Sequence, residues 1–195
     1  LHDSQSRFDE NIVGRSLPFW ERYLPVARTY FPGQLDDVDA EAMTRAVCRV
    51  ARTPIRVESD EVTYNLHILL RFELEVDLLE ERVAVADLPE AWNAKMEQYL
   101  GYTPADDVEG VMQDVHWSEG YLGYFPTYTL GNLYSAALRE AMQRDLDLDA
   151  HIRAGEFGPI LAWLRDKVHR HGAVPLGEDL MLEVTGRPLG VDAFM

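Results

Sequence analysis

The sequence predicts a mainly α-helical protein, and two observations support this class. Several segments carry apolar residues three and four positions apart, the spacing that gives a helix one apolar face. Proline and glycine separate these segments, as they do at helix ends and turns. The chain has 195 residues, 47% of them hydrophobic, which suffices for a substantial core, so we expect a single helical domain over residues 1–195.

The first well-marked helix is expected after Asp39. Its carboxylate can accept hydrogen bonds from the N–H groups that the first turn of a helix leaves unpaired. The apolar positions that follow share the helical spacing and predict one stripe toward a core: Met43, Ala46, Val47, Val50 and Ala51.

The segment from Val62 to Leu78 is harder to interpret, because every even-numbered position in it is apolar. Alternation is formally a strand pattern. Seventeen residues without a turn signal, however, exceed the usual length of a strand, about three to ten residues. We therefore expect one long core helix, with a long β-hairpin as the alternative.

Three more helices are predicted from their ends and their apolar spacing. One begins with Asp87 as its cap, because Pro89 and Glu90 follow at positions that suit a helix start, and it stops at Gly101. The others span residues 130–146 and 159–172. The intervening stretches 101–110 and 119–129 are rich in Gly, Pro and Tyr, which favours rigid loops that present side chains.

Charge and cysteine content argue against several function classes. Eighteen basic against 34 acidic residues give a formal net charge of −16, which would repel a phosphate backbone, so no nucleic-acid partner is expected. No apolar run approaches the roughly 20 residues of a membrane helix, so no membrane span is expected. Cys48 is the only cysteine, which rules out a disulfide within the chain and favours a reducing, cytoplasmic location.

Four short blocks follow one another along the chain: HDSQ at residues 2–5, IRVESD at 55–60, GVMQDVHW at 110–117 and GYFPTY at 123–128. Together they resemble the Taq-type metallocarboxypeptidases, whose patterns include HE(S/G)Q, IRxxAD and GxxQDxHW. The similarity extends to HRHG at 169–172 and TGRPL at 185–189, and so spans nearly the whole chain. The HExxH zinc motif of that family does not occur in this sequence.

This resemblance implies a helical lobe of a gluzincin-like (neurolysin-like) metallopeptidase fold, with at most a small β element near the cleft. It implies that residues 1–195 are the C-terminal part of a larger catalytic domain that releases C-terminal residues from peptides by metal-activated water. The implied metal is divalent, zinc or cobalt, and the implied assembly is a homodimer. Because the HExxH residues are missing, we expect the chain by itself to be inactive.

Asp3 lies at the position of the family's third metal ligand, a carboxylate that completes a site with two histidines. The family pattern has Glu there, and the shorter Asp sets its carboxylate roughly 1.5 Å further back. The alternative is that Asp3 caps the helix running through Ser6, Phe8 and Ile12.

Arg56 is the candidate that binds the free carboxylate of a substrate, since a guanidinium can donate two parallel hydrogen bonds to it. Ser59 stands where the family pattern has Ala, a small change. The alternative is a structural ion pair of Arg56 with Asp60 or Glu58.

His116 is expected to donate to the oxyanion that forms when water attacks the peptide carbonyl, with Gln113 or Asp114 fixing its tautomer. The alternative is a core histidine beside Trp117. Tyr124 and Tyr128 flank a Phe-Pro pair, where a stiff loop can hold a phenol hydroxyl against the same oxyanion, and Tyr128 is the preferred candidate.

The other histidines are interpreted as structural. His169 and His171, near Gly172, are expected to stabilise a helix C-terminus through its dipole. His67 falls inside the long apolar segment and His151 in an acidic stretch.

A second function remains open from the sequence: a degenerate helical protein that binds peptides or another subunit without turnover. Asp in place of Glu at residue 3 and the missing HExxH both fit it. An acidic interaction module without any link to proteolysis is a weaker idea, because it leaves the matches at residues 113–117 and 123–128 unexplained.

Overall fold

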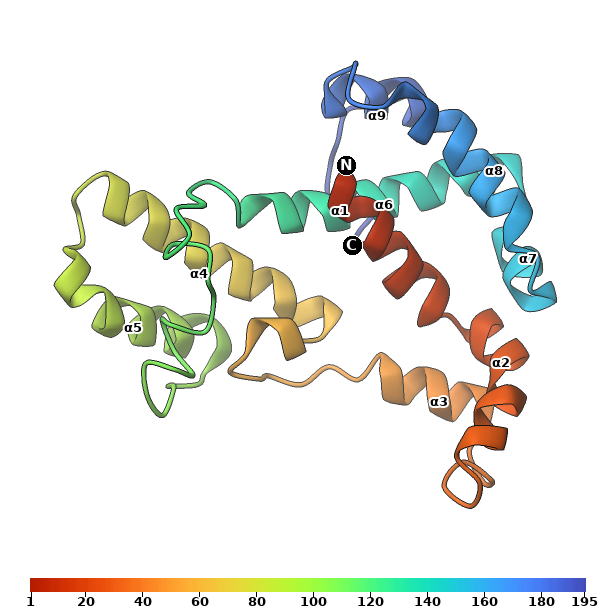
Figure 1. Ribbon diagram of the computed structural model, residues 1–195, viewed down its shortest axis with the longest axis horizontal. Helices are drawn as coiled ribbons and strands as arrows, with labels where there is room; N and C mark the ends of the chain where they lie inside the picture. The colour runs from red at the N-terminus through yellow and green to blue at the C-terminus, as the bar shows by residue number, and fades with distance from the viewer. The chain divides into compact units, whose positions relative to one another are not determined.

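The computed structural model describes all 195 residues and contains helices and turns but no strand, so the mainly helical fold predicted above is confirmed (Figure 1). None of the helices has both the length and the apolar character needed to cross a lipid bilayer. Four short segments are π- or 3₁₀-helical: η1 (Phe8–Gly14, π), η2 (Arg56–Glu58), η3 (Val85–Asp87) and η4 (His169–His171). The α-helices are α1 (His2–Arg7), α2 (Leu17–Tyr30), α3 (Ala40–Val47), α4 (Glu61–Leu79), α5 (Leu88–Leu100), α6 (Pro126–Asp145), α7 (Leu148–Ala154), α8 (Phe157–Lys167) and α9 (Gly177–Thr185).

The chain forms two compact units. Unit 1 combines residues 1–47 with residues 130–195, and unit 2 comprises residues 48–129. Each unit has its own apolar core. The expectation that residues 1–195 form a single helical domain, the C-terminal part of a larger catalytic domain, stays a prediction.

Unit 2 is built on the pair α4 and α5, which lie side by side and are joined through η3 (Figure 1). Asp60 caps α4: its Oδ1 accepts from the N–H groups of Val62 and Thr63, both at 2.9 Å. The segment 62–78 is therefore one helix, as predicted, and the hairpin alternative is wrong. The core between the two helices is made of Leu70, Leu74, Leu88, Trp92, Met96 and Leu100.

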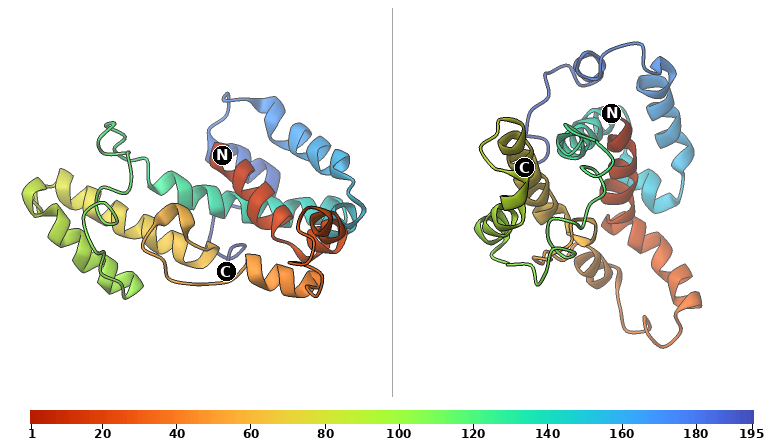
Figure 2. Two further views of the ribbon diagram at one scale, coloured as in Figure 1. Left: turned by 60° about the horizontal axis from the view of Figure 1, so that its bottom comes forward. Right: turned by 60° about the vertical axis from the view of Figure 1, so that its left-hand side comes forward.

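Unit 1 is built around α6, whose buried face includes Leu138 and Met142. Helix α1 packs against α6 in all views (Figures 1 and 2). Gly131 makes this close approach possible, because a Cβ there would lie 2.8 Å from the Cβ of Asp3. Helices α7, α8 and α9 cover the remaining core with Leu148, Ile152, Ile160, Trp163, Leu180 and Met181.

Several helix ends differ from the predictions. Asp39 does cap α3, with the N–H of Ala42 2.7 Å from its carboxylate, but α3 ends at Val47 and buries no residue, so the predicted stripe through Val50 is wrong. Asp87 precedes α5 without forming a side-chain cap, whereas Gly101 ends this helix in the left-handed conformation, φ 60°, as predicted. Helix α6 starts before residue 130, and α8 gives way to η4 before residue 172.

Candidate active site

Two of the sequence blocks meet in unit 2, although the contacting residues Arg56 and Gln113 are 57 positions apart in the chain. Residues 55–60 form η2 and the cap of α4, and residues 110–117 form a series of turns after α5. The amide of Gln113 joins them: its oxygen accepts from the backbone N–H of Arg56 at 2.9 Å, and its nitrogen donates to the carbonyl of Pro54 at 3.1 Å. The structure thus brings Arg56, Gln113 and Asp114 together.

Asp114 is shared by two buried arginines. Its Oδ1 accepts from Nε and Nη2 of Arg56, at 2.9 and 2.7 Å, and its Oδ2 accepts from Nε of Arg71 at 2.6 Å. Burial by itself would raise the pKa of this carboxyl, but the charges and hydrogen bonds of Arg71 and Arg56 outweigh it and lower the pKa. Asp114 is therefore ionised at neutral pH and neutralises part of the buried positive charge.

Arg56 is only 6% exposed, and its ion-pair partner is Asp114. The alternative from the sequence, an ion pair of Arg56 with Asp60 or Glu58, is therefore wrong. Asp60 instead caps α4 and also accepts from the N–H of Ala51. The Nε/Nη2 edge of Arg56, which usually grips a carboxylate, is taken by Asp114, and Nη1 donates to the hydroxyl of Tyr64 at 2.9 Å. A substrate carboxylate would have to use the remaining N–H groups on Nη1 and Nη2.

His116 is buried, and its Nε2 lies 2.9 Å from the hydroxyl of Tyr128. Burial lowers the pKa of this imidazole, and the charges of Arg56 and Arg71 lower it further, against the opposing effect of Asp114. The ring is therefore neutral at pH 7. Its Nδ1 has no hydrogen-bond partner and stands 3.9 Å from Asp114, too far for a hydrogen bond, so neither Asp114 nor Gln113 bonds to this imidazole.

Aromatic rings surround His116. Its ring centroid lies 4.4 Å from that of Phe125, 5.5 Å from Tyr124 and 5.7 Å from Tyr128. Tyr124 is 41% exposed, while Tyr128 also lies under the guanidinium of Arg56, whose Cζ is 4.9 Å from the ring centroid. Tyr128, the tyrosine preferred from the sequence, thus contacts both His116 and Arg56.

Two buried polar residues of this cluster, Arg71 and Glu75, were missed from the sequence. Arg71 is completely buried, stacks on Trp92 with its Cζ 4.5 Å from the ring centroid, and has its pKa lowered by burial to about 10. Glu75 accepts from the indole Nε1 of Trp117 at 2.8 Å and from the N–H of Gly123. A signal for both was present, because two opposite charges stand four residues apart in the mostly apolar segment 62–78.

Asp3 belongs to unit 1, where it lies in the first turn of α1. This helix starts after Leu1 without a side-chain cap, so the alternative that Asp3 caps it is wrong. The adjacent Ser4 is fully buried, and His2 is fully exposed. Within the chain, no three His, Cys, Asp or Glu side chains gather as a metal site requires, so the donors of these residues alone do not make a catalytic zinc site.

His169 has a different contact from the one predicted. Its Nε2 lies 2.8 Å from the amide oxygen of Gln5, in the HDSQ block, and so links η4 to α1 within unit 1. Gln5 in turn donates to Ser4 at 3.0 Å. The hydrogen bonds from His169 to Gln5 and from Gln5 to Ser4 hold the residues of α1 that directly follow Asp3.

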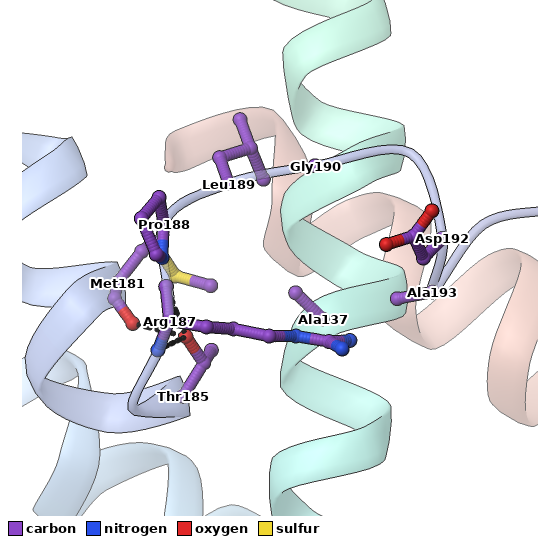
Figure 3. A pocket seen from close by; sticks show the side chains of 9 residues that line it. All are labelled: Ala137, Met181, Thr185, Arg187, Pro188, Leu189, Gly190, Asp192 and Ala193. Atoms are coloured by element: carbon purple, nitrogen blue, oxygen red, sulfur yellow. Dashed lines mark hydrogen bonds between the residues drawn. The ribbon is translucent and has the colours of Figure 1, made fainter.

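A separate cavity of about 40 Å³ lies in unit 1 between α6, α9 and the C-terminal segment (Figure 3). The side chain of Arg187 extends across it past Ala137, and Thr185 bonds to the backbone at both Met181 and Arg187. A space of this size holds no more than a few water molecules. Four residues of the TGRPL block line it, Thr185, Arg187, Pro188 and Leu189, but none of the candidate site residues does.

The fold and the buried Arg–Asp–His–Tyr cluster fit a helical peptidase, and comparison with known proteins gives the family. The chain belongs to the carboxypeptidase Taq (M32) metallopeptidases, whose family model matches residues 1–195. The resemblance drawn from the four sequence blocks is thereby confirmed.

Two curated relatives are Thermostable carboxypeptidase 1 of Thermus thermophilus, 48% identical over 196 residues, and Carboxypeptidase 1 of Bacillus subtilis, 44% identical over 192 residues. The matches cover 100% and 98% of this chain but 38% of each relative, so the chain spans about two fifths of their length. Among solved structures, the M32 carboxypeptidase from Deinococcus radiodurans matches with a TM-score of 0.95 at 43% identity, and Pyrococcus furiosus carboxypeptidase with 0.94 at 42%. Each match covers 100% of this chain and 39% of the other.

Proposed function

We propose that this chain supplies the substrate contacts of a metallocarboxypeptidase, which releases C-terminal residues from peptides by metal-activated water. The observation that carries the proposal is the pair formed by His116 and Tyr128, 2.9 Å apart and backed by Arg56 and Asp114 in a family of carboxypeptidases. The proposed substrates are peptides with a free C-terminus. A homodimer in the cytoplasm is part of the same proposal.

His116 and Tyr128 are the proposed contacts of the developing oxyanion. A neutral imidazole and a phenol each carry one donor and bring no charge that would bind water tightly. One of the two donors is used in the bond between His116 and Tyr128, so both reach the oxyanion only when that bond opens. Burial of the ring keeps His116 in that neutral form, because it lowers the imidazole pKa. Tyr124, which is more exposed and faces the same imidazole, is proposed as a further contact to the peptide.

Arg56 is proposed as the group that selects a free carboxylate, through the N–H groups that Asp114 and Tyr64 leave available. Asp114 and Gln113 hold it in place, Asp114 by the ion pair and Gln113 through the backbone N–H. Their proposed role is to orient Arg56 and the turn that carries His116.

The metal of the family is proposed to be zinc or cobalt, with Asp3 of unit 1 as one ligand. The remaining ligands and the general base of an HExxH motif are not among these 195 residues. We therefore propose that the chain alone does not hydrolyse peptides, and that an HExxH segment must be added for turnover.

Calorimetric titration of the chain with an acylated tripeptide tests the substrate contacts. The peptide with a free C-terminus should bind, and its C-terminal amide should bind at least about tenfold more weakly, as expected for one lost charged hydrogen-bond pair. His116→Gln and Tyr128→Phe should weaken binding, whereas Tyr121→Phe, on an exposed ring nearby, should not. Equal affinities for the acid and the amide would reject the role of Arg56.

A second candidate function is a degenerate protein that binds peptides or another subunit without turnover. The specific observation in its favour is the lack of a three-donor metal cluster, together with Asp at residue 3. Adding a polypeptide that carries the HExxH helix of the family, with zinc or cobalt, separates the two functions. Turnover on addition supports the peptidase, and peptide binding without turnover supports the alternative.

A further inference from the structure

Helix α4 buries three polar side chains on one face, and this feature is independent of the sequence blocks that define the family. His67, Arg71 and Glu75 follow one another at intervals of four residues, so they lie above one another on the helix. All three are at most 3% exposed. Burial of polar groups is unfavourable unless each is hydrogen-bonded, and here each one is. We call these three residues the polar spine of α4.

The members of the polar spine hold the non-helical segments of unit 2 at different points. His67 Nε2 lies 3.1 Å from the carbonyl of Thr53, just before η2. Arg71 donates to Asp114 and, from Nη2, to the amide oxygen of Gln113 at 2.7 Å. One rigid helix thus sets the distance between the segment that carries Arg56 and the turns that carry His116.

Glu75 holds the two turns on either side of the candidate oxyanion contacts. Its Oε2 accepts from Trp117, the neighbour of His116, and its Oε1 accepts from the backbone of Gly123, at the start of the segment that leads to Tyr128. The close ion pairs of α4 join Arg71 to Asp114 and Glu73 to Lys95, and Glu75 takes part in neither. Both of its oxygens are committed to placing these turns.

We propose that Arg71 and Glu75 are positioning residues that set the His116–Tyr128 pair for the reaction. That this placement serves catalysis rests on the proposed function, whereas the placement of His116 relative to Tyr128 rests on the contacts alone. His116 has no bond to α4 itself, and its place follows from its neighbours Asp114 and Trp117, both of which bond to the polar spine. Loss of either bond therefore moves the imidazole relative to the phenol.

Glu75→Gln is the sharpest variant, because an amide keeps one acceptor oxygen but turns an N–H group toward the second donor. One of the two bonds, to Trp117 or to Gly123, must break. Glu73→Gln is the matched control: it removes a carboxylate from the same helix two residues away, where the partners are Lys95 and Tyr99 rather than the candidate site. Trp117→Phe, which removes the indole donor but keeps an aromatic ring toward Trp92 and Phe125, is the second variant if Glu75→Gln does not fold.

The measurement is NMR of the folded chain, following the His116 ring and the indole N–H of Trp117, together with calorimetric titration of the free acylated tripeptide. Glu75→Gln should shift the His116 ring signals and weaken peptide binding about tenfold, and Glu73→Gln should change neither. Unchanged His116 signals in a folded Glu75→Gln or Trp117→Phe chain would overturn the proposal. If the wild-type chain binds no peptide, the proposed function fails, and the His116 signals still decide the positioning role by themselves.

Discussion

Acidification should destabilise unit 2 through one buried imidazole, that of His67. Burial and the neighbouring charge of Arg71 lower the pKa of His67 from 6.5 to about 4 in the folded protein. The unfolded chain therefore binds this proton more tightly than the folded chain does. The stability that neutral His67 provides is complete above pH 6.5 and is lost as the pH falls from 6.5 toward 4.

The size of this loss follows from the gap between the two pKa values. At about 1.36 kcal/mol per pH unit, a fall from 6.5 to about 4 corresponds to a total of about 3 kcal/mol. At pH 5 about 2 kcal/mol should already be lost. Below pH 4, His67 contributes no further change, and the loss there belongs to carboxyls with lowered pKa values such as Asp114.

The assay is urea unfolding at half-unit steps between pH 7.5 and 4.5, for the wild-type chain and for His67→Gln. Glutamine can keep an N–H group for the carbonyl of Thr53 but does not titrate. The variant should therefore show a shallower fall in the free energy of unfolding over this range. His2→Gln removes a fully exposed histidine and controls for histidine content. Parallel curves for wild type and His67→Gln would refute the reasoning.

Substitutions at three further positions test the core, a helix cap and a helix end of unit 2 by denaturant unfolding. Trp92→Ala should lower the free energy of unfolding by about 3 to 5 kcal/mol, because the ring is 1% exposed at the α4–α5 contact. Trp92→Phe should cost less, because Phe keeps most of the buried ring volume and the indole N–H has no hydrogen-bond partner to lose; equal costs would contradict this. Asp60→Ala should cost about 1 to 2 kcal/mol at pH 7 and progressively less below pH 3.8, since the bonds from Thr63, Ala51 and Val62 outweigh burial and lower the pKa of Asp60; a cost that does not change with pH would count against the cap. Gly101→Ala should cost about 1 kcal/mol, because φ is 60° and the added Cβ would meet Arg52 Nη1 at 2.6 Å; unaltered stability would show that the backbone can relax there.

Helix α4 shows which features of the fold could be predicted from the sequence and which could not. Its length and the missing turn signals identified α4 correctly, but the alternation of apolar residues did not reveal which ones are buried. Val62 and Phe72, both apolar, are 60% and 44% exposed, while Arg71 is fully buried. A helix that packs against several segments buries whatever side chains face them, so the exposure of each residue depends on its neighbours in space.

The partners of Arg56 show the same limit at the candidate site. The sequence offered Asp60 and Glu58 as neighbours, but the structure pairs Arg56 with Asp114, 58 residues away, which Arg71 also holds. The family motifs pointed to Arg56, Gln113, Asp114 and His116, and their order along the chain did not say which of them bond to each other.

The sequence by itself determined the helical class, several helix ends and the M32 family, because caps, stops and short motifs are properties of residues close together in the chain. Only the tertiary structure decided that one carboxylate serves two arginines and that Glu75 ties the turns on either side of His116. Buried charges persist only where desolvation is offset by partners in space, and those partners come from segments far apart in the chain.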